Sequence, residues 1–87
     1  MSIPDHIVAA FKAFPAGDVE SLRAYAWSEL ARCSRISTTD TELKIERVPV
    51  LYLSETRVLI SFWRGDRCAA AYEFISDGKV AVMKLRK

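Results

Sequence analysis

The chain has 87 residues, of which 51% are hydrophobic and 28% charged, and its formal net charge is +2. This length fits one domain, and this composition is typical of a globular chain and not of a disordered one. No apolar run approaches the roughly 18 residues of a membrane-spanning helix, and the N-terminus lacks the basic and apolar regions of a signal peptide. We therefore expect a single cytoplasmic domain at 1–87 that makes no contact with a membrane.

The first predicted element is an amphipathic helix over about residues 3–14. Ser2 can cap its first turn, Pro4 suits the first helical position, and Asp5 complements the positive end of the helix dipole. The apolar residues that follow are spaced four, four and three apart, which places them on one helix face: Ile3, Ile7, Phe11 and Phe14.

A second helix is predicted over about residues 18–34. The Pro15-Ala16-Gly17 segment ends the first helix, and Asp18 is a suitable N-cap for the next one. Its apolar stripe consists of Val19, Leu22, Ala26, Leu30 and Cys33. The stripe would pack this helix against a sheet.

Four strands are predicted after the helices, at about 43–53, 57–64, 67–75 and 79–86. Glu55-Thr56, Gly65-Asp66 and Asp77-Gly78 separate them, and the last two dipeptides are typical of two-residue hairpin turns. Pro49 lies inside the first strand and cannot donate a ladder hydrogen bond, so that strand should be an edge or be bulged there. The predicted fold class is α+β, with two N-terminal helices packed on a four-stranded antiparallel β-meander.

An apolar outer face is predicted for this sheet. Side chains alternate between the faces of a strand, and in an unbulged hairpin Val58 lies opposite Glu73. With that register, both faces are apolar, whereas a solvated sheet normally has one polar face. The outer face is predicted to be an interface for a second copy or another protein, through Leu51, Leu53, Val58, Ile60, Phe62, Ile75, Val80 and Val82.

The same register predicts hydroxyl and indole groups within the apolar inner face. They belong to Tyr52, Ser61, Trp63 and Tyr72. Convergent polar groups in an apolar concavity are typical of a small-ligand pocket, so a small-molecule ligand is one hypothesis. The alternative is an ordinary core whose polar atoms reach its edge.

Glu73 is the one acid predicted among the apolar side chains of the outer face. A carboxylate there either has a raised pKa or finds a cation, and Lys84 is the nearest candidate on the predicted face. A salt bridge at the rim is the simpler interpretation, and an acid within a pocket is the alternative.

No motif in the sequence indicates catalysis, a metal site or a cofactor. His6 is the only histidine, and its neighbour Asp5 points away from it on a helix, so no catalytic pair is formed. Cys33 and Cys68 give no metal-ligand spacing and are interpreted as buried apolar residues, although a bridge between them stays open. We expect no catalytic residue, no metal and no cofactor.

The charge is unevenly distributed. Residues 1–42 carry four Lys/Arg and six Asp/Glu, whereas residues 43–87 carry nine Lys/Arg and five Asp/Glu. A mildly basic sheet makes weak nucleic-acid binding a third hypothesis, but no aromatic residues interleave with the basic ones as in single-strand platforms. A solvated surface explains the charges equally well.

Two segments resemble the nuclear transport factor 2-like (SnoaL-like) superfamily. They are the helix opening Ala16-Gly17-Asp18-Val19-Glu20-Ser21-Leu22 and the hairpin at residues 72–80, Tyr-Glu-Phe-Ile-Ser-Asp-Gly-Lys-Val. The resemblance implies N-terminal helices on a strongly curved antiparallel sheet, dimerisation through the outer sheet face, and a pocket at Trp63 and Tyr72. The chain lacks the Asp/His pair that enzymes of this superfamily use, so the resemblance implies no catalysis.

The sequence therefore favours a non-enzymatic interaction module that assembles through an apolar sheet face. A small-ligand-binding or degenerate cone-type domain is the first alternative, and a weak nucleic-acid binder is the second.

Overall fold

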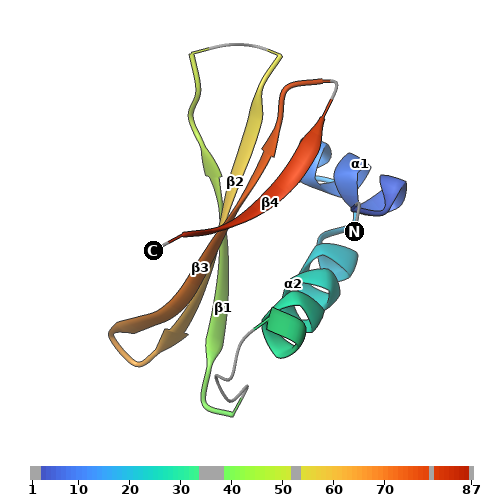
Figure 1. Cartoon of the computed structure of the whole chain (residues 1–87). Coiled ribbons are helices and arrows are strands. Elements are labelled where there is room, and N and C mark those ends of the chain that lie inside the picture. The colour runs from blue at the N-terminus through green and yellow to red at the C-terminus, as the bar shows by residue number, and fades with distance from the viewer. Residues whose placement is uncertain (1–2, 34–38, 52–53, 79, 87) are drawn as a thin grey trace.

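The fold has two layers, a pair of helices and an antiparallel sheet, in a computed structural model that describes residues 3–33, 39–51, 54–78 and 80–86. The helices are α1 (Asp5–Ala13) and α2 (Val19–Cys33), and the strands are β1 (Glu42–Val48), β2 (Thr56–Arg64), β3 (Arg67–Ser76) and β4 (Ala81–Arg86). The strand order is β1-β2-β3-β4, and both helices lie on one side of the sheet (Figure 1). The predicted α+β class is confirmed.

Helix α1 buries the apolar face that its spacing predicts. Ile3, Ile7 and Phe11 are buried, together with Ala10. Asp5 lies in the first turn and Lys12 in the last, where their charges complement the helix dipole. Arg47 of β1 fixes the end of this helix, because its Nη1 donates to the carbonyl oxygens of Lys12 and Phe14 at 3.0 and 2.7 Å.

Helix α2 begins at the predicted cap. The carboxylate of Asp18 accepts hydrogen bonds from the backbone N–H of Ser21 at 3.1 Å and from its hydroxyl at 2.6 Å. These bonds hold the pKa of Asp18 below its ordinary value, because they stabilise the ionised form. Leu22, Ala26 and Leu30 are buried along the stripe that faces the sheet.

The inner face of the sheet, which the helices cover, carries the core. Aromatic contacts connect the two layers: Phe11 stacks on Phe74 with ring centroids 4.2 Å apart, and Trp27 meets Phe62 edge-on at 5.1 Å. Tyr72 then packs edge-on against Phe62 at 6.2 Å. The strand side chains on this inner face include Leu43, Ile45, Val58, Ile60, Phe62, Tyr72, Phe74 and Met83.

Strand β3 contains a β-bulge that the sequence analysis did not predict. Trp63 pairs with Cys68, but the preceding residue of β2, Phe62, pairs with Ala70, so Ala69 is an extra residue in β3. A bulge of one residue moves every later side chain of the strand to the opposite face. Val58 is consequently opposite Phe74 rather than Glu73.

The first strand is shorter than predicted. It ends at Val48, directly before Pro49, whereas the prediction extended it to residue 53. Proline has no N–H group for the ladder, which explains a strand that stops there. The Gly65-Asp66 turn is where it was predicted: Arg64 pairs with Arg67 across it, and Gly65 has a φ of 63°. Within the described residues, neither helix has the length and apolarity needed to cross a membrane.

Candidate functional site

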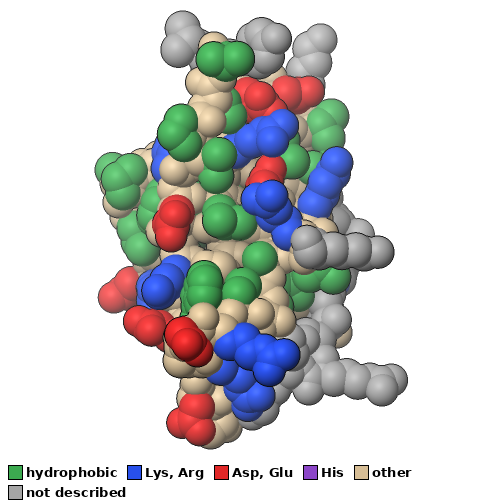
Figure 2. Space-filling view, turned by 90° about the vertical axis from the view of Figure 1, so that its left-hand side faces the viewer, with side chains coloured by type: hydrophobic (Ala, Val, Ile, Leu, Met, Phe, Trp, Pro, Cys, Tyr) green, Lys and Arg blue, Asp and Glu red, His purple; other side chains and the backbone are tan. Residues whose placement is uncertain are grey.

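The outer face is the side of the sheet that points away from both helices (Figure 1). Residues paired across the strands share a face, which assigns the outer side chains as Glu42, Lys44, Glu46, Val48, Arg57, Leu59, Ser61, Trp63, Ala71, Glu73, Ile75, Val82, Lys84 and Arg86. Figure 2 shows this side of the molecule, where apolar patches alternate with side chains of both charges. Leu59, Trp63, Ile75 and Val82 are half-exposed there.

A network of ion pairs crosses the middle of the outer face. Glu73 is buried; one of its carboxylate oxygens accepts a hydrogen bond from Arg57 at 3.2 Å, and the other forms an ion pair with Arg86 at 3.1 Å. Arg57 also donates to Glu55 at 2.9 Å, a hydrogen bond that raises the pKa of its guanidinium. The predicted cation, Lys84, is the strand-pairing neighbour of Glu73, but this acid forms its ion pairs with the two arginines. Glu73 is thus a structural anion between arginines.

Trp63 is held in a fixed orientation on this face. Its indole Nε1 donates to the hydroxyl of Ser61 at 2.9 Å, and the ammonium of Lys44 lies 5.0 Å from the ring centroid. The hydrogen bond satisfies the indole donor, and a cation over a ring stabilises it electrostatically. The half-exposed ring therefore presents a preorganised apolar surface to solvent.

An open groove of about 790 Å³ lies beside Trp63. The run Ala69-Ala70-Ala71 lines one side of it: Ala71 has its side chain on the outer face, whereas Ala70 pairs with Phe62 and packs against the core. Leu59 and Ser61 contribute from β2. Glu46 of β1 and Arg86 of β4 also line it. The groove thus has an apolar floor with an acidic and a basic residue at its sides.

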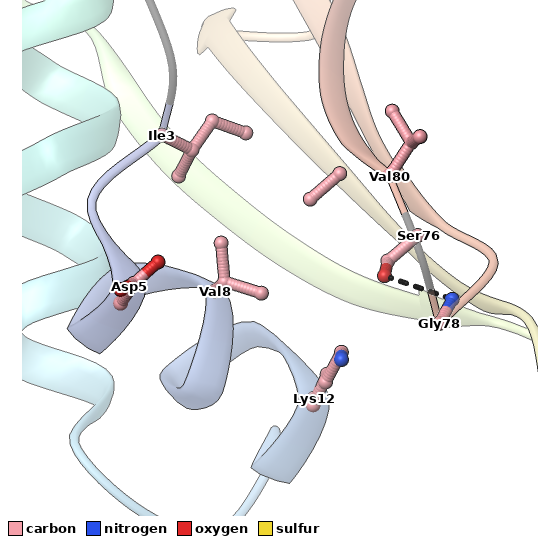
Figure 3. Close-up of a pocket in the computed structure, with 8 residues that line it drawn as sticks. Ile3, Asp5, Val8, Lys12, Ser76, Gly78 and Val80 are labelled. Carbon is pink, nitrogen blue, oxygen red and sulfur yellow. Dashed lines mark hydrogen bonds between the residues drawn. The ribbon is translucent and has the colours of Figure 1, made fainter.

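A smaller cavity of about 220 Å³ lies between α1 and the β3–β4 turn (Figure 3). Ile3 and Val8 line it from the helix side, and Val80 lines it from the strand side. The hydroxyl of Ser76 accepts from the backbone N–H of Gly78 at 3.5 Å at its edge. Its volume is below the roughly 300 Å³ at which ordinary ligand pockets begin.

The structure corrects the predicted interface. Val58, Ile60 and Phe62 are 0%, 1% and 0% exposed and lie in the core beneath the chain's own helices. The prediction failed because it assumed an unbulged β2–β3 hairpin. Of the remaining residues, Ile75 and Val82 are on the outer face, Leu51 and Val80 are exposed outside the strands, and Leu53 is outside the described residues.

The predicted ligand pocket is brought together only in part. Ser61 and Trp63 are hydrogen-bonded neighbours in the groove, but on the outer face rather than the inner one. Tyr72 is buried on the opposite side of the sheet against Phe62, and Tyr52 lies outside the described residues. The bulge separated Tyr72 from the other two.

The groove also contains residues that the sequence did not single out as a site. Glu46, Leu59, Ala71 and Arg86 were assigned to no site, because their proximity depends on the register of three strand pairs. The run of three alanines was the one available signal, since alanine has a low β propensity.

Groups with reactive chemistry are dispersed over the part of the chain that the structure describes. No set of three or more His, Cys, Asp or Glu side chains there is placed to hold a metal ion. Cys68 is a free, exposed cysteine, so its interpretation as a buried apolar residue is wrong; its thiol lies 3.5 Å from the carbonyl oxygen of Ala70. Because Cys68 is free in the structure, it is not bridged to Cys33, whose side chain lies outside the described residues.

Comparisons with protein-family models, curated proteins and solved structures found no match to this chain. The resemblance to the nuclear transport factor 2-like superfamily therefore stays a prediction.

Proposed function

We propose that this chain is a non-enzymatic interaction module that binds another protein through the outer face of its sheet. The observation that carries the proposal is the group of half-exposed apolar side chains, Leu59, Trp63, Ile75 and Val82, on a face that no described helix covers. Large apolar side chains gathered on one surface commonly mark an interaction site. Like the predicted interface, this face carries apolar side chains, but mostly different residues supply them.

The composition of this face suits a protein partner. Tryptophan and arginine are enriched among the residues that dominate binding energy, and Trp63 stands beside a hollow in which a partner side chain can pack. Because Ser61 and Lys44 already fix the indole ring, binding would lose little side-chain entropy there. Charges of both signs around the apolar groups resemble the polar rim of an interface.

The two alternatives have weaker support. Helix side chains such as Phe11 and Trp27 pack on the inner face, where the predicted cone-type pocket would lie. A small apolar ligand would therefore bind in the outer groove, whose volume is in the range of ligand pockets. A nucleic-acid site is less favoured, because the basic side chains of the outer face alternate with Glu42, Glu46 and Glu73 instead of forming a stripe.

Site-specific photo-cross-linking in cells tests the proposal. Benzoylphenylalanine at Ile75, on the outer face, is expected to give covalent adducts with protein, because a bound partner would lie within reach of that side chain. The matched control is the same substitution at Ala24, which is exposed on α2. Circular dichroism establishes that both variants fold.

The comparison of adducts at Ile75 with adducts at Ala24 decides whether the proposal holds. Adducts at Ile75 and none at Ala24 support the outer face as the binding surface. No adduct at Ile75, or equal adducts at both positions, would contradict the proposal.

A further inference from the structure

Strand β4 is one edge of the sheet, and the direction of its backbone groups follows from the hairpin that leads into it (Figure 1). The N–H of Asp77 donates to the carbonyl oxygen of Val80 at 3.3 Å, so these two residues form a hydrogen-bonded pair beside the turn. Hydrogen-bonded and non-hydrogen-bonded pairs alternate along an antiparallel ladder. Ala81, Met83 and Leu85 therefore belong to non-hydrogen-bonded pairs, and their N–H and C=O groups point away from β3.

This edge is less protected against strand pairing than the edge formed by β1. Charged residues occupy four of the seven positions of β1 but only two of the six positions of β4. Pro49 also follows β1 directly, whereas the large apolar side chains of Val80 and Leu85 are exposed at β4. Because charged side chains and proline are what blunt the edges of natural sheets, β4 is the edge that can accept another strand.

We propose that the partner binds with an extended segment that pairs with the free edge of β4 and continues the sheet. The inference rests on the proposed function and names the segment by which the partner binds. Free backbone groups at every second residue match an extended chain, whereas a helix uses its N–H and C=O groups internally. The added strand lies beside Val82, which pairs with Ile75 on the outer face, so one partner reaches both the edge and that face.

The inner side of β4 calls for apolar residues in the added strand. Leu85 pairs with the buried Tyr72 and shares its face, yet Leu85 is 58% exposed. Met83, on the same side, packs against the core and is half-exposed. Side chains of neighbouring strands contact each other on one face of a sheet. Apolar side chains beside Met83 and Leu85 would therefore extend the core past β4 and cover both residues.

The outer side of β4 calls for an acidic residue. Arg86 forms an ion pair with Glu73 at 3.1 Å, whereas Lys84 forms none with any residue that the structure describes. Opposite charges on neighbouring strands stabilise a sheet, and like charges destabilise it. Lys84 thus favours a strand with Asp or Glu beside it and disfavours a second copy of β4, which brings its own Lys84 and Arg86. The segment has alternating apolar and acidic residues.

Hydrogen exchange of single backbone amides, followed by NMR spectroscopy, tests the strand addition. In the free chain the ladder with β3 should protect the amides of Val82 and Lys84, and those of Met83 and Leu85 should exchange at least about tenfold faster. When the protein captured by cross-linking at Ile75 is added, the amides of Met83 and Leu85 should slow by at least about tenfold, because the added strand accepts their hydrogen bonds.

Substitutions at the edge provide a second measurement. Leu85→Pro removes a free donor but no ladder bond, whereas Leu85→Val keeps the donor, and circular dichroism establishes that both variants fold. We expect Leu85→Pro to bind the captured protein about tenfold more weakly than Leu85→Val, because a carbonyl of the added strand loses its donor. Lys84→Glu should weaken binding by about fivefold, and Arg23→Glu, an exposed reversal on α2, should not.

The inference is overturned if the amides of Met83 and Leu85 stay unprotected in the complex, or if Leu85→Pro binds as tightly as Leu85→Val. Either result keeps the proposed function, because the captured protein then binds without pairing with β4. Equal binding by Lys84→Glu and Arg23→Glu contradicts an acidic segment. A chain that captures no protein at Ile75 refutes both proposals.

Discussion

Deleting one alanine from Ala69-Ala70-Ala71 is expected to leave the chain folded, and deleting two is expected to unfold it. With one alanine removed the bulge disappears, and Tyr72 still pairs with Ile60 on the inner face. With two removed, the later residues of β3 turn over. Phe74, which is fully buried, would then face solvent, and the charged Glu73 would enter the core.

The two deletions differ greatly in expected stability. Loss of the bulge should lower the free energy of unfolding by at most about 3 kcal/mol, as ordinary single changes do. Turning over β3 removes the stack of Phe11 on Phe74 and buries an unpaired carboxylate, each at a cost of about 3–5 kcal/mol. The two costs together are comparable with the whole stability of a typical domain, roughly 5–15 kcal/mol. Urea titration followed by circular dichroism measures both. A folded double deletion, or an unfolded single deletion, would show that the bulge at Ala69 is wrongly placed.

Phe62→Ala should destabilise the protein by about 3–5 kcal/mol, whereas Trp63→Ala should lower the free energy of unfolding by about 1 kcal/mol or less. The residues are neighbours in β2, but Phe62 is fully buried beneath Trp27 and Trp63 is half-exposed on the other face. Removing Trp63 forfeits the hydrogen bond to Ser61 and the contact with Lys44.

The pair of substitutions is its own control, because each removes a large aromatic ring from the same strand. Chemical denaturation at low protein concentration, where self-association does not contribute, gives the two free energies. Equal losses, or a larger loss for Trp63→Ala, would contradict the assignment of the two faces.

The helices and the order of the strands could be predicted from local signals. Apolar spacing and the Asp18 cap define the two helices, and Gly65-Asp66 defines the β2–β3 turn. Each of these features depends on residues close in sequence, where periodicity and capping chemistry act directly.

The faces of the sheet could not be predicted in the same way. A single extra residue, Ala69, decides whether Val58 shares a face with Phe74 or with Glu73, and alanine carries no turn signal that marks a bulge. The benefit of the bulge appears only in three dimensions, where it lets Phe74 reach Phe11. Ser61 and Trp63 were correctly placed together because they are two residues apart in one strand, whereas Tyr72 depended on the register between strands.

The central claim is that a partner covers Trp63, and the fluorescence of that residue tests it most directly. Trp27 is the only other tryptophan, and Trp27→Phe keeps an aromatic ring against Phe62, so emission from this variant reports on the outer face alone. When the protein captured by cross-linking at Ile75 is added, we expect the emission, after subtraction of the partner's own signal, to shift to shorter wavelength and quenching by acrylamide to fall, because the bound partner buries the half-exposed ring. An emission spectrum and quenching that stay the same while light scattering reports a complex with that protein would contradict the claim.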